Sequence, residues 1–130
     1  MSLQRLAKEL KALEECSHFN AKPFDNDVSN WTATIPGPVG SRYENKHFQV
    51  TIRIPNNYPF SPPEVSMKTQ ILHPNILMGY IHLDILEDKW SPTLNIQKVL
   101  LSISSLLEKP NLKFLSSDIS RKSSSLSHLF

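Results

Sequence analysis

The alternation of apolar and polar residues in the middle of the chain is the feature that most constrains the fold. The alternating residues are Phe48, Gln49, Val50, Thr51, Ile52, Arg53 and Ile54. A two-residue period is typical of a strand with one buried and one solvated face. Pro55 follows directly, and it ends the strand because proline has no N–H group for a ladder. The sequence therefore predicts an antiparallel sheet that is covered on one side only.

Three further segments are predicted as strands of the same sheet. A short strand is expected at residues 20–24, and a second at residues 31–35, which the run Pro36–Gly37–Pro38 stops. Another is expected at residues 64–68, with Val65 and Met67 facing inward. With residues 48–54 these segments form a four-stranded antiparallel meander.

Two segments have the period of amphipathic helices. From Ser2, a plausible N-cap, to about Glu15, one helical stripe consists of Leu3, Leu6, Leu10 and Leu13. From Asn95, a second N-cap, the helical spacing is set by Ile96, Val99, Leu100, Ile103, Leu106 and Leu107. Lys109–Pro110 is predicted to end this second helix.

Length and composition restrict the class of protein. The chain has 130 residues, which suits one domain with its own core. One cysteine excludes an intramolecular disulfide and a cysteine-rich zinc site. A net charge of +2, with basic residues spread along the chain, argues against nucleic acid as a partner. Neither a signal peptide nor a membrane span is predicted, so we expect a cytoplasmic and nuclear protein without a membrane partner.

The stretch from His73 to Pro92 carries an unusual density of special residues. It reads HPNILMGYIHLDILEDKWSP, with His-Pro-Asn at its start, a turn at Gly79, and Trp90-Ser91-Pro92 at its end. This stretch resembles the active-site region of the ubiquitin-conjugating enzymes (UBC core family). The resemblance runs from Leu3 to Asn75 and, with one deletion, on to Asn111.

The position of the catalytic thiol is where the chain departs from this family. The family has there the cysteine that carries ubiquitin as a thioester, whereas this chain has His82. Imidazole cannot replace the thiol, because an acyl-imidazole is higher in energy than a thioester and hydrolyses readily. The only thiol, Cys16, lies far away in the sequence. The segment between Asn75 and Gly79 is also one residue shorter than is usual, so we expect position 82 to sit off the family's register.

The resemblance implies roles for the other motif residues. His73 is expected to fix its loop through hydrogen bonds, and Asn75, which in the family assists attack on the thioester, is expected to brace the loop. The residues implied to bind ligases of the RING type are Arg5, Phe60, Pro63, Ser91 and Pro92. Arg5 and Lys8 are implied to meet the activating enzyme. Where the family commonly has two glycines, Asn45–Lys46 stands, and Lys46 is expected to strain a left-handed turn.

The resemblance implies an α+β, UBC-like fold over residues 1–111. It consists of an N-terminal helix, the four-stranded antiparallel meander and the central helix, and the family's last two helices are expected to be absent. Residues 112–130 form a serine-rich tail without periodicity, which we expect to be disordered. The family has an acidic residue that helps to position and deprotonate the incoming lysine. The resemblance places Lys113 or Phe114 at this position, and a cation there would repel the lysine, so we expect a second loss for catalysis.

These observations predict a pseudoenzyme. The leading hypothesis is a non-catalytic member that binds a RING-type ubiquitin ligase, ubiquitin or a catalytic conjugating enzyme. The alternatives are a degenerate copy without independent function, residual ubiquitin transferase activity, and an activity that depends on histidine or a metal. No cofactor is expected. No metal site is expected either, because His73, His82, Asp84 and His47 have no ligand spacing that would organise them.

Overall fold

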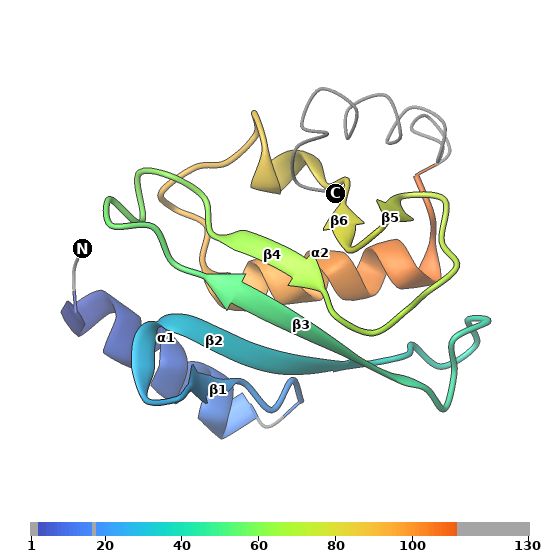
Figure 1. Cartoon of the computed structure of the whole chain (residues 1–130), viewed down its shortest axis with the longest axis horizontal. Coiled ribbons are helices and arrows are strands. Elements are labelled where there is room, and N and C mark those ends of the chain that lie inside the picture. The colour runs from blue at the N-terminus through green and yellow to red at the C-terminus, as the bar shows by residue number, and fades with distance from the viewer. Residues whose placement is uncertain (1–2, 17, 112–130) are drawn as a thin grey trace.

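The computed structural model describes residues 3–16 and 18–111 of the chain. The elements are two α-helices, α1 (Leu3–Cys16) and α2 (Ile96–Glu108), and one short 3-10 helix, η1 (Asp84–Leu86). The strands are β1 (Lys22–Phe24), β2 (Asp27–Pro36), β3 (His47–Arg53), β4 (Glu64–Met67), β5 (Ile76–Leu77) and β6 (Tyr80–Ile81). Figure 1 shows α2 running across one face of the sheet and α1 beside the β1–β2 end. The α+β class and the predicted helices are confirmed.

The sheet core follows from the predicted alternation. Strand β2 pairs with β3 so that Trp31 faces Ile52 and Ile35 faces Phe48, and β3 pairs with β4 so that Val50 faces Met67. All of these side chains are buried. They pack with the apolar stripe of α2, whose six predicted residues are all buried as well. Burial of these two faces against each other supplies the main stabilisation of the domain.

The helix ends also follow the sequence. The Asn95 side chain accepts a hydrogen bond from the Lys98 N–H at 2.8 Å, which satisfies one of the unpaired donors at the start of α2. The helix ends before Lys109–Pro110 as predicted. In α1, Leu6 and Leu13 are buried, but the prediction that Leu3 joins the stripe is wrong, since its side chain is 63% exposed. Leu3 is the first residue of α1, and burial along this stripe begins only at Leu6.

The sheet has six strands rather than the four predicted. Its order is β1-β2-β3-β4-β6-β5, so a small hairpin from the His73–Pro92 stretch is added beyond the meander. Strand β6 ends at Ile81, and the apolar residues Leu83 and Ile85 that follow do not extend it, because the chain turns into η1 at Asp84. Strands of two residues carry no periodic signal, which explains why the pattern missed them.

The β2–β3 hairpin resolves the expected strain at Asn45–Lys46. Asn45 adopts the left-handed conformation, with φ of 68°, and Lys46 does not. Asparagine tolerates this conformation better than most residues, so the turn is accommodated by the more suitable of the pair.

Within residues 3–16 and 18–111, no helix is long and apolar enough to cross a bilayer. Residues 112–130 lie outside the described residues. The predictions of a disordered tail, of the absence of the family's last two helices, and of Lys113 or Phe114 at the acidic position therefore stay predictions.

Candidate functional site

His82 lies just after β6, opposite Asn75 across the β5–β6 hairpin. The hairpin pairs Ile76 with Ile81, and the His82 N–H continues the ladder by donating to the Asn75 carbonyl at 2.8 Å. Its side chain is only 4% exposed. The His82 side chain is therefore buried in the protein. Ile81 and His82 are both buried although they are neighbours, so the alternation of buried and exposed residues expected of a strand ends here.

A carboxylate and a phenol lie next to this histidine. The Nδ1 atom of His82 is 3.4 Å from the Oε2 atom of Glu87, and the Tyr80 hydroxyl donates a hydrogen bond to the same carboxylate. Burial, followed by the hydrogen bond to Glu87, raises the pKa of Tyr80. Asp84, in contrast, is exposed to solvent. Of these groups Glu87 contacts the His82 ring, and none of them supplies a thiol that could hold an acyl group.

The only cysteine lies elsewhere. Cys16 is exposed at the C-terminal end of α1. Figure 1 shows that α1 and the segment after β6 lie on opposite sides of the β1–β4 meander. Within residues 3–16 and 18–111, no three His, Cys, Asp or Glu side chains gather as ligands for a metal ion.

His73 and Asn75 tie the loop before β5 to the C-terminal end of α2. The Nε2 atom of His73 lies 2.7 Å from the Leu106 carbonyl, and its Nδ1 atom accepts from the Asn75 N–H at 3.0 Å. This pair of bonds requires a neutral ring that is protonated on Nε2. Burial lowers the pKa of His73, with the charge of Arg42 as a smaller cause.

The Asn75 side chain makes two bonds to one backbone position. Its Nδ2 group donates to the Asn111 carbonyl at 2.8 Å, and its Oδ1 atom accepts from the Asn111 N–H at 2.7 Å. Asn75 is fully buried. Asn75 therefore holds the backbone of Asn111, which follows α2, against the loop of the His-Pro-Asn motif.

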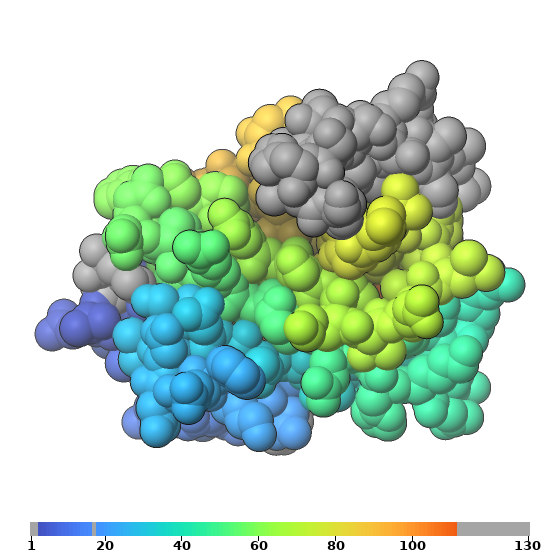
Figure 2. Space-filling view, viewed as in Figure 1, coloured from blue at the N-terminus to red at the C-terminus, as the bar shows by residue number. Residues whose placement is uncertain are grey.

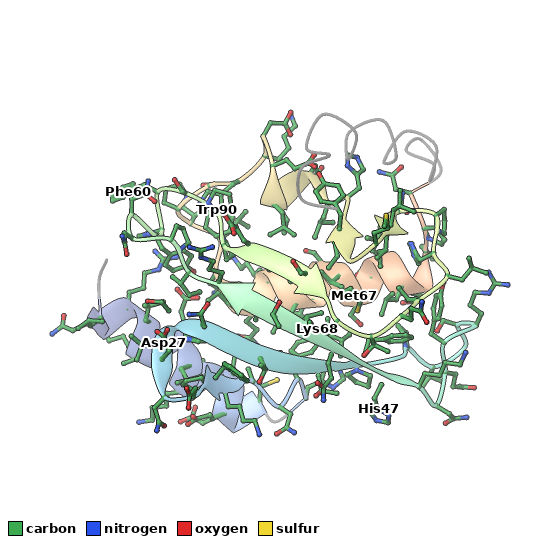
Figure 3. The ribbon with its side chains drawn as sticks, viewed as in Figure 1. Asp27, His47, Phe60, Met67, Lys68 and Trp90 are labelled. Atoms are coloured by element: carbon green, nitrogen blue, oxygen red, sulfur yellow. The ribbon has the colours of Figure 1, made fainter. Side chains whose placement is uncertain are left out.

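The loops that the resemblance implies for ligase binding lie next to each other. The Trp90 indole N–H donates to the Pro59 carbonyl at 2.8 Å, which joins the loop around residue 60 to the loop around residue 91. Figure 3 shows Phe60 and Trp90 at the same end of the molecule. Phe60 is 77% exposed and Pro92 is exposed, whereas Ser91 is half-buried. Pro63 is buried, so it supports its loop from within and is not part of the accessible surface.

The two basic residues of α1 are placed differently. Lys8 is exposed, whereas Arg5 is half-buried and bonded within the protein. The Arg5 guanidinium donates to Glu9 at 2.9 Å and to the Leu94 carbonyl at 2.7 Å, and lies 5.4 Å from the centre of the Tyr58 ring. Of the two side chains implied to meet the activating enzyme, Lys8 is thus the more accessible.

Glu9 connects these parts, and sequence reasoning did not find it. Its carboxylate accepts from the Tyr58 hydroxyl at 2.8 and 2.9 Å and from the Ile96 N–H at 2.9 Å, in addition to Arg5. The i, i+4 spacing of Arg5 and Glu9 was a visible signal for their ion pair. Tyr58 follows Glu9 by 49 positions in the sequence and Ile96 follows it by 87, so no local pattern reveals these two contacts.

The fold and the His-Pro-Asn site together define a UBC domain. The family model described as "Ubiquitin-conjugating enzyme" matches residues 5–122, and the chain belongs to this family. The domain boundary at residue 111 stays a prediction.

Two relatives support this assignment. The "Probable ubiquitin-conjugating enzyme E2 31" of Arabidopsis thaliana is 48% identical over 110 residues, which cover 83% of this chain and 71% of the relative. The solved structure of a ubiquitin-conjugating enzyme E2 domain from Toxoplasma gondii superposes with a TM-score of 0.80 at 41% identity, covering 85% of this chain and 77% of that chain.

Proposed function

We propose that this protein is a non-catalytic member of the ubiquitin-conjugating family that acts by binding. The observation that carries this proposal is His82, at the position where the resemblance expects a thiol: its side chain is buried, and its backbone N–H is hydrogen-bonded into the hairpin. An imidazole there cannot store ubiquitin as a thioester.

The surface formed by Phe60, Ser91 and Pro92 supports a RING-type ligase as the binding partner. Phe60 is a large apolar side chain presented by a proline-rich loop, and the Trp90–Pro59 hydrogen bond holds the second loop beside it. Such a preorganised surface loses little entropy when a partner binds. Ubiquitin or a catalytic conjugating enzyme are the other partners of this proposal, and the cytoplasm and nucleus are the compartments in which we expect it.

Loading with ubiquitin tests the non-catalytic part. The chain is incubated with activating enzyme, ATP and ubiquitin and then run on a non-reducing gel, beside an active relative as positive control. We expect no adduct that a reducing agent removes. An adduct that is lost in the Cys16→Ser variant would contradict the proposal and identify Cys16 as the carrier.

A pull-down on an immobilised RING domain that retains an active relative tests the binding part. We expect the wild-type chain to be retained and the Phe60→Ala variant to be lost. Val39→Ala is the matched control, because Val39 is an equally exposed apolar residue in the distant β2–β3 hairpin. Equal retention of both variants, or no retention of the wild type, would refute the ligase surface.

A further inference from the structure

A cleft lies where β3 and the segment after β4 separate. The β3–β4 ladder ends at Val50 and Met67, and the N–H groups of Lys68 and Thr69 both donate to the Gln49 carbonyl, at 2.7 and 3.4 Å. Beyond this point the β2–β3 hairpin and the segment after β4 diverge, and the cleft between them has a volume of about 520 Å³. Figure 2 shows the turquoise surface of the β2–β3 hairpin next to the yellow-green surface of residues 69–72.

The charge of the lining is one-sided. Arg42, Lys46 and His47 line the cleft, and none of the described residues that line it is Asp or Glu. The nearby Glu44 is exposed, and its carboxylate accepts from the Gly40 N–H at 3.1 Å. Figure 3 shows His47 at the hairpin end of β3, on the side away from α2. Three cationic or protonatable groups therefore favour an anionic ligand.

The inner wall of the cleft is apolar. Phe48 is buried there, Ile71 packs against the core, and the Leu72 side chain is 84% exposed at the edge. The Tyr43 hydroxyl donates to the Leu72 carbonyl, which fixes the wall relative to the hairpin. A ligand that is only a small anion would leave this apolar surface uncovered.

The backbone of the wall also has free hydrogen-bonding groups. Among the described residues, no hydrogen bond is formed by the N–H groups of Gln70, Ile71 and Leu72. Peptide N–H groups without a partner inside the protein are satisfied by water or by the main chain of an extended peptide. A peptide, unlike a free anion, can use the cations, the apolar wall and these N–H groups at the same time.

We propose that this cleft binds an extended acidic peptide segment of a partner protein. In this arrangement the acidic side chains lie among Arg42, Lys46 and His47, and an apolar side chain of the peptide contacts Ile71 and Leu72. Lys46 stands where the family resemblance implies a glycine, so its charge is a property of this chain and not a requirement of the fold. The proposal is independent of the loss of the thiol and of the ligase surface.

Fluorescence anisotropy with defined peptides tests this inference on the full chain. The probe is a fluorescein-labelled peptide of alternating Glu and Leu, and its control carries Gln in place of Glu. We expect saturable binding of the acidic probe only. The Lys46→Glu variant should bind about tenfold more weakly, because one favourable charge contact becomes a repulsive one. Lys98→Glu, the same change at an exposed position of α2, should leave the affinity unchanged.

Several outcomes would overturn the inference. These are absence of saturable binding, equal affinity for the Gln control, and an equal loss in the Lys46→Glu and Lys98→Glu variants. Inorganic phosphate that displaces the probe at concentrations comparable with the free acidic peptide would show an anion site without peptide recognition, and would also overturn it. Circular dichroism on both variants confirms that they are folded before binding is compared.

Discussion

Replacing Glu9 by alanine should destabilise the domain more than replacing any exposed residue of α1, because the Glu9 side chain is only 10% exposed and accepts hydrogen bonds from three other residues. The Tyr58 hydroxyl would lose its acceptor inside the protein, where Tyr58 is only 2% exposed, at a cost of about 1–3 kcal/mol. The Ile96 N–H would lose an anionic acceptor at the start of α2, which adds about 0.3–1 kcal/mol. The Arg5–Glu9 ion pair is partly solvated and adds at most about 0.5 kcal/mol. The expected total is about 1.3–4.5 kcal/mol.

A double-mutant cycle isolates the contact with Tyr58. Tyr58→Phe removes the donor, so Glu9→Ala no longer creates an unsatisfied buried hydroxyl in that background. The cost of Glu9→Ala should therefore be about 1 kcal/mol smaller there than in the wild type. A tyrosine hydroxyl is protonated at neutral pH, and burial, followed by the hydrogen bond to Glu9, raises the pKa of Tyr58 further, so it remains a donor in this contact.

Urea unfolding followed by circular dichroism measures each free energy of unfolding. Glu14→Ala is the matched control, since Glu14 is an exposed glutamate of the same helix. It should change the free energy of unfolding by less than about 0.5 kcal/mol. The reasoning is refuted if Glu9→Ala costs no more than Glu14→Ala, or if its cost is the same with and without Tyr58→Phe.

Three further predictions concern the β5–β6 hairpin, the loop of the His-Pro-Asn motif, and helix α2. Met78→Asn should raise the free energy of unfolding by about 0.5–1 kcal/mol in urea titrations, because Met78 has a φ of 52° in the turn with Gly79, where asparagine is preferred. The lowered pKa of His73 means that the unfolded chain binds more protons below about pH 6.5, so stability should fall as the pH decreases from 7 to about 5.5. The His73→Gln variant should show a smaller fall. Asn95→Ala should cost about 1 kcal/mol in thermal or urea unfolding, and Asn95→Asp much less.

Each of these has a contradicting result. A Met78→Asn variant that is less stable than the wild type would show that the left-handed turn is not strained by methionine. An unchanged pH dependence in His73→Gln would place the titrating group elsewhere. Equal losses in Asn95→Ala and Asn95→Asp would show that the bond to Lys98 contributes nothing.

Periodic segments of the fold were predictable because their burial is written in local spacing. All six apolar residues predicted for the second helix are buried, and its Asn95 cap forms the expected bond. The alternation from Phe48 likewise fixes β3 and the face it buries. In both cases a run of several turns or pairs repeats one signal, which outweighs the preference of any single residue.

The rest depends on contacts between distant residues. The β5–β6 hairpin has two residues in each strand, and its pairing is set by the turn at Met78–Gly79 and not by periodicity. Glu9 reads in the sequence as an exposed helix residue, yet it bonds to Tyr58 and to the start of α2. Pro63 reads as a surface loop residue and is buried. Sequence spacing gives none of these distances.

The His-Pro-Asn motif has a structural role in this chain that does not require catalysis. His73 bonds to Leu106, and Asn75 bonds in both directions to Asn111, so the motif joins the hairpin to the end of α2. These bonds are complete without a substrate, and breaking them would expose or orphan buried polar groups. The presence of the motif is thus explained by the stability of the fold alone. The neighbouring His82 is buried and its N–H donates to the Asn75 carbonyl, so its backbone belongs to the same set of internal bonds.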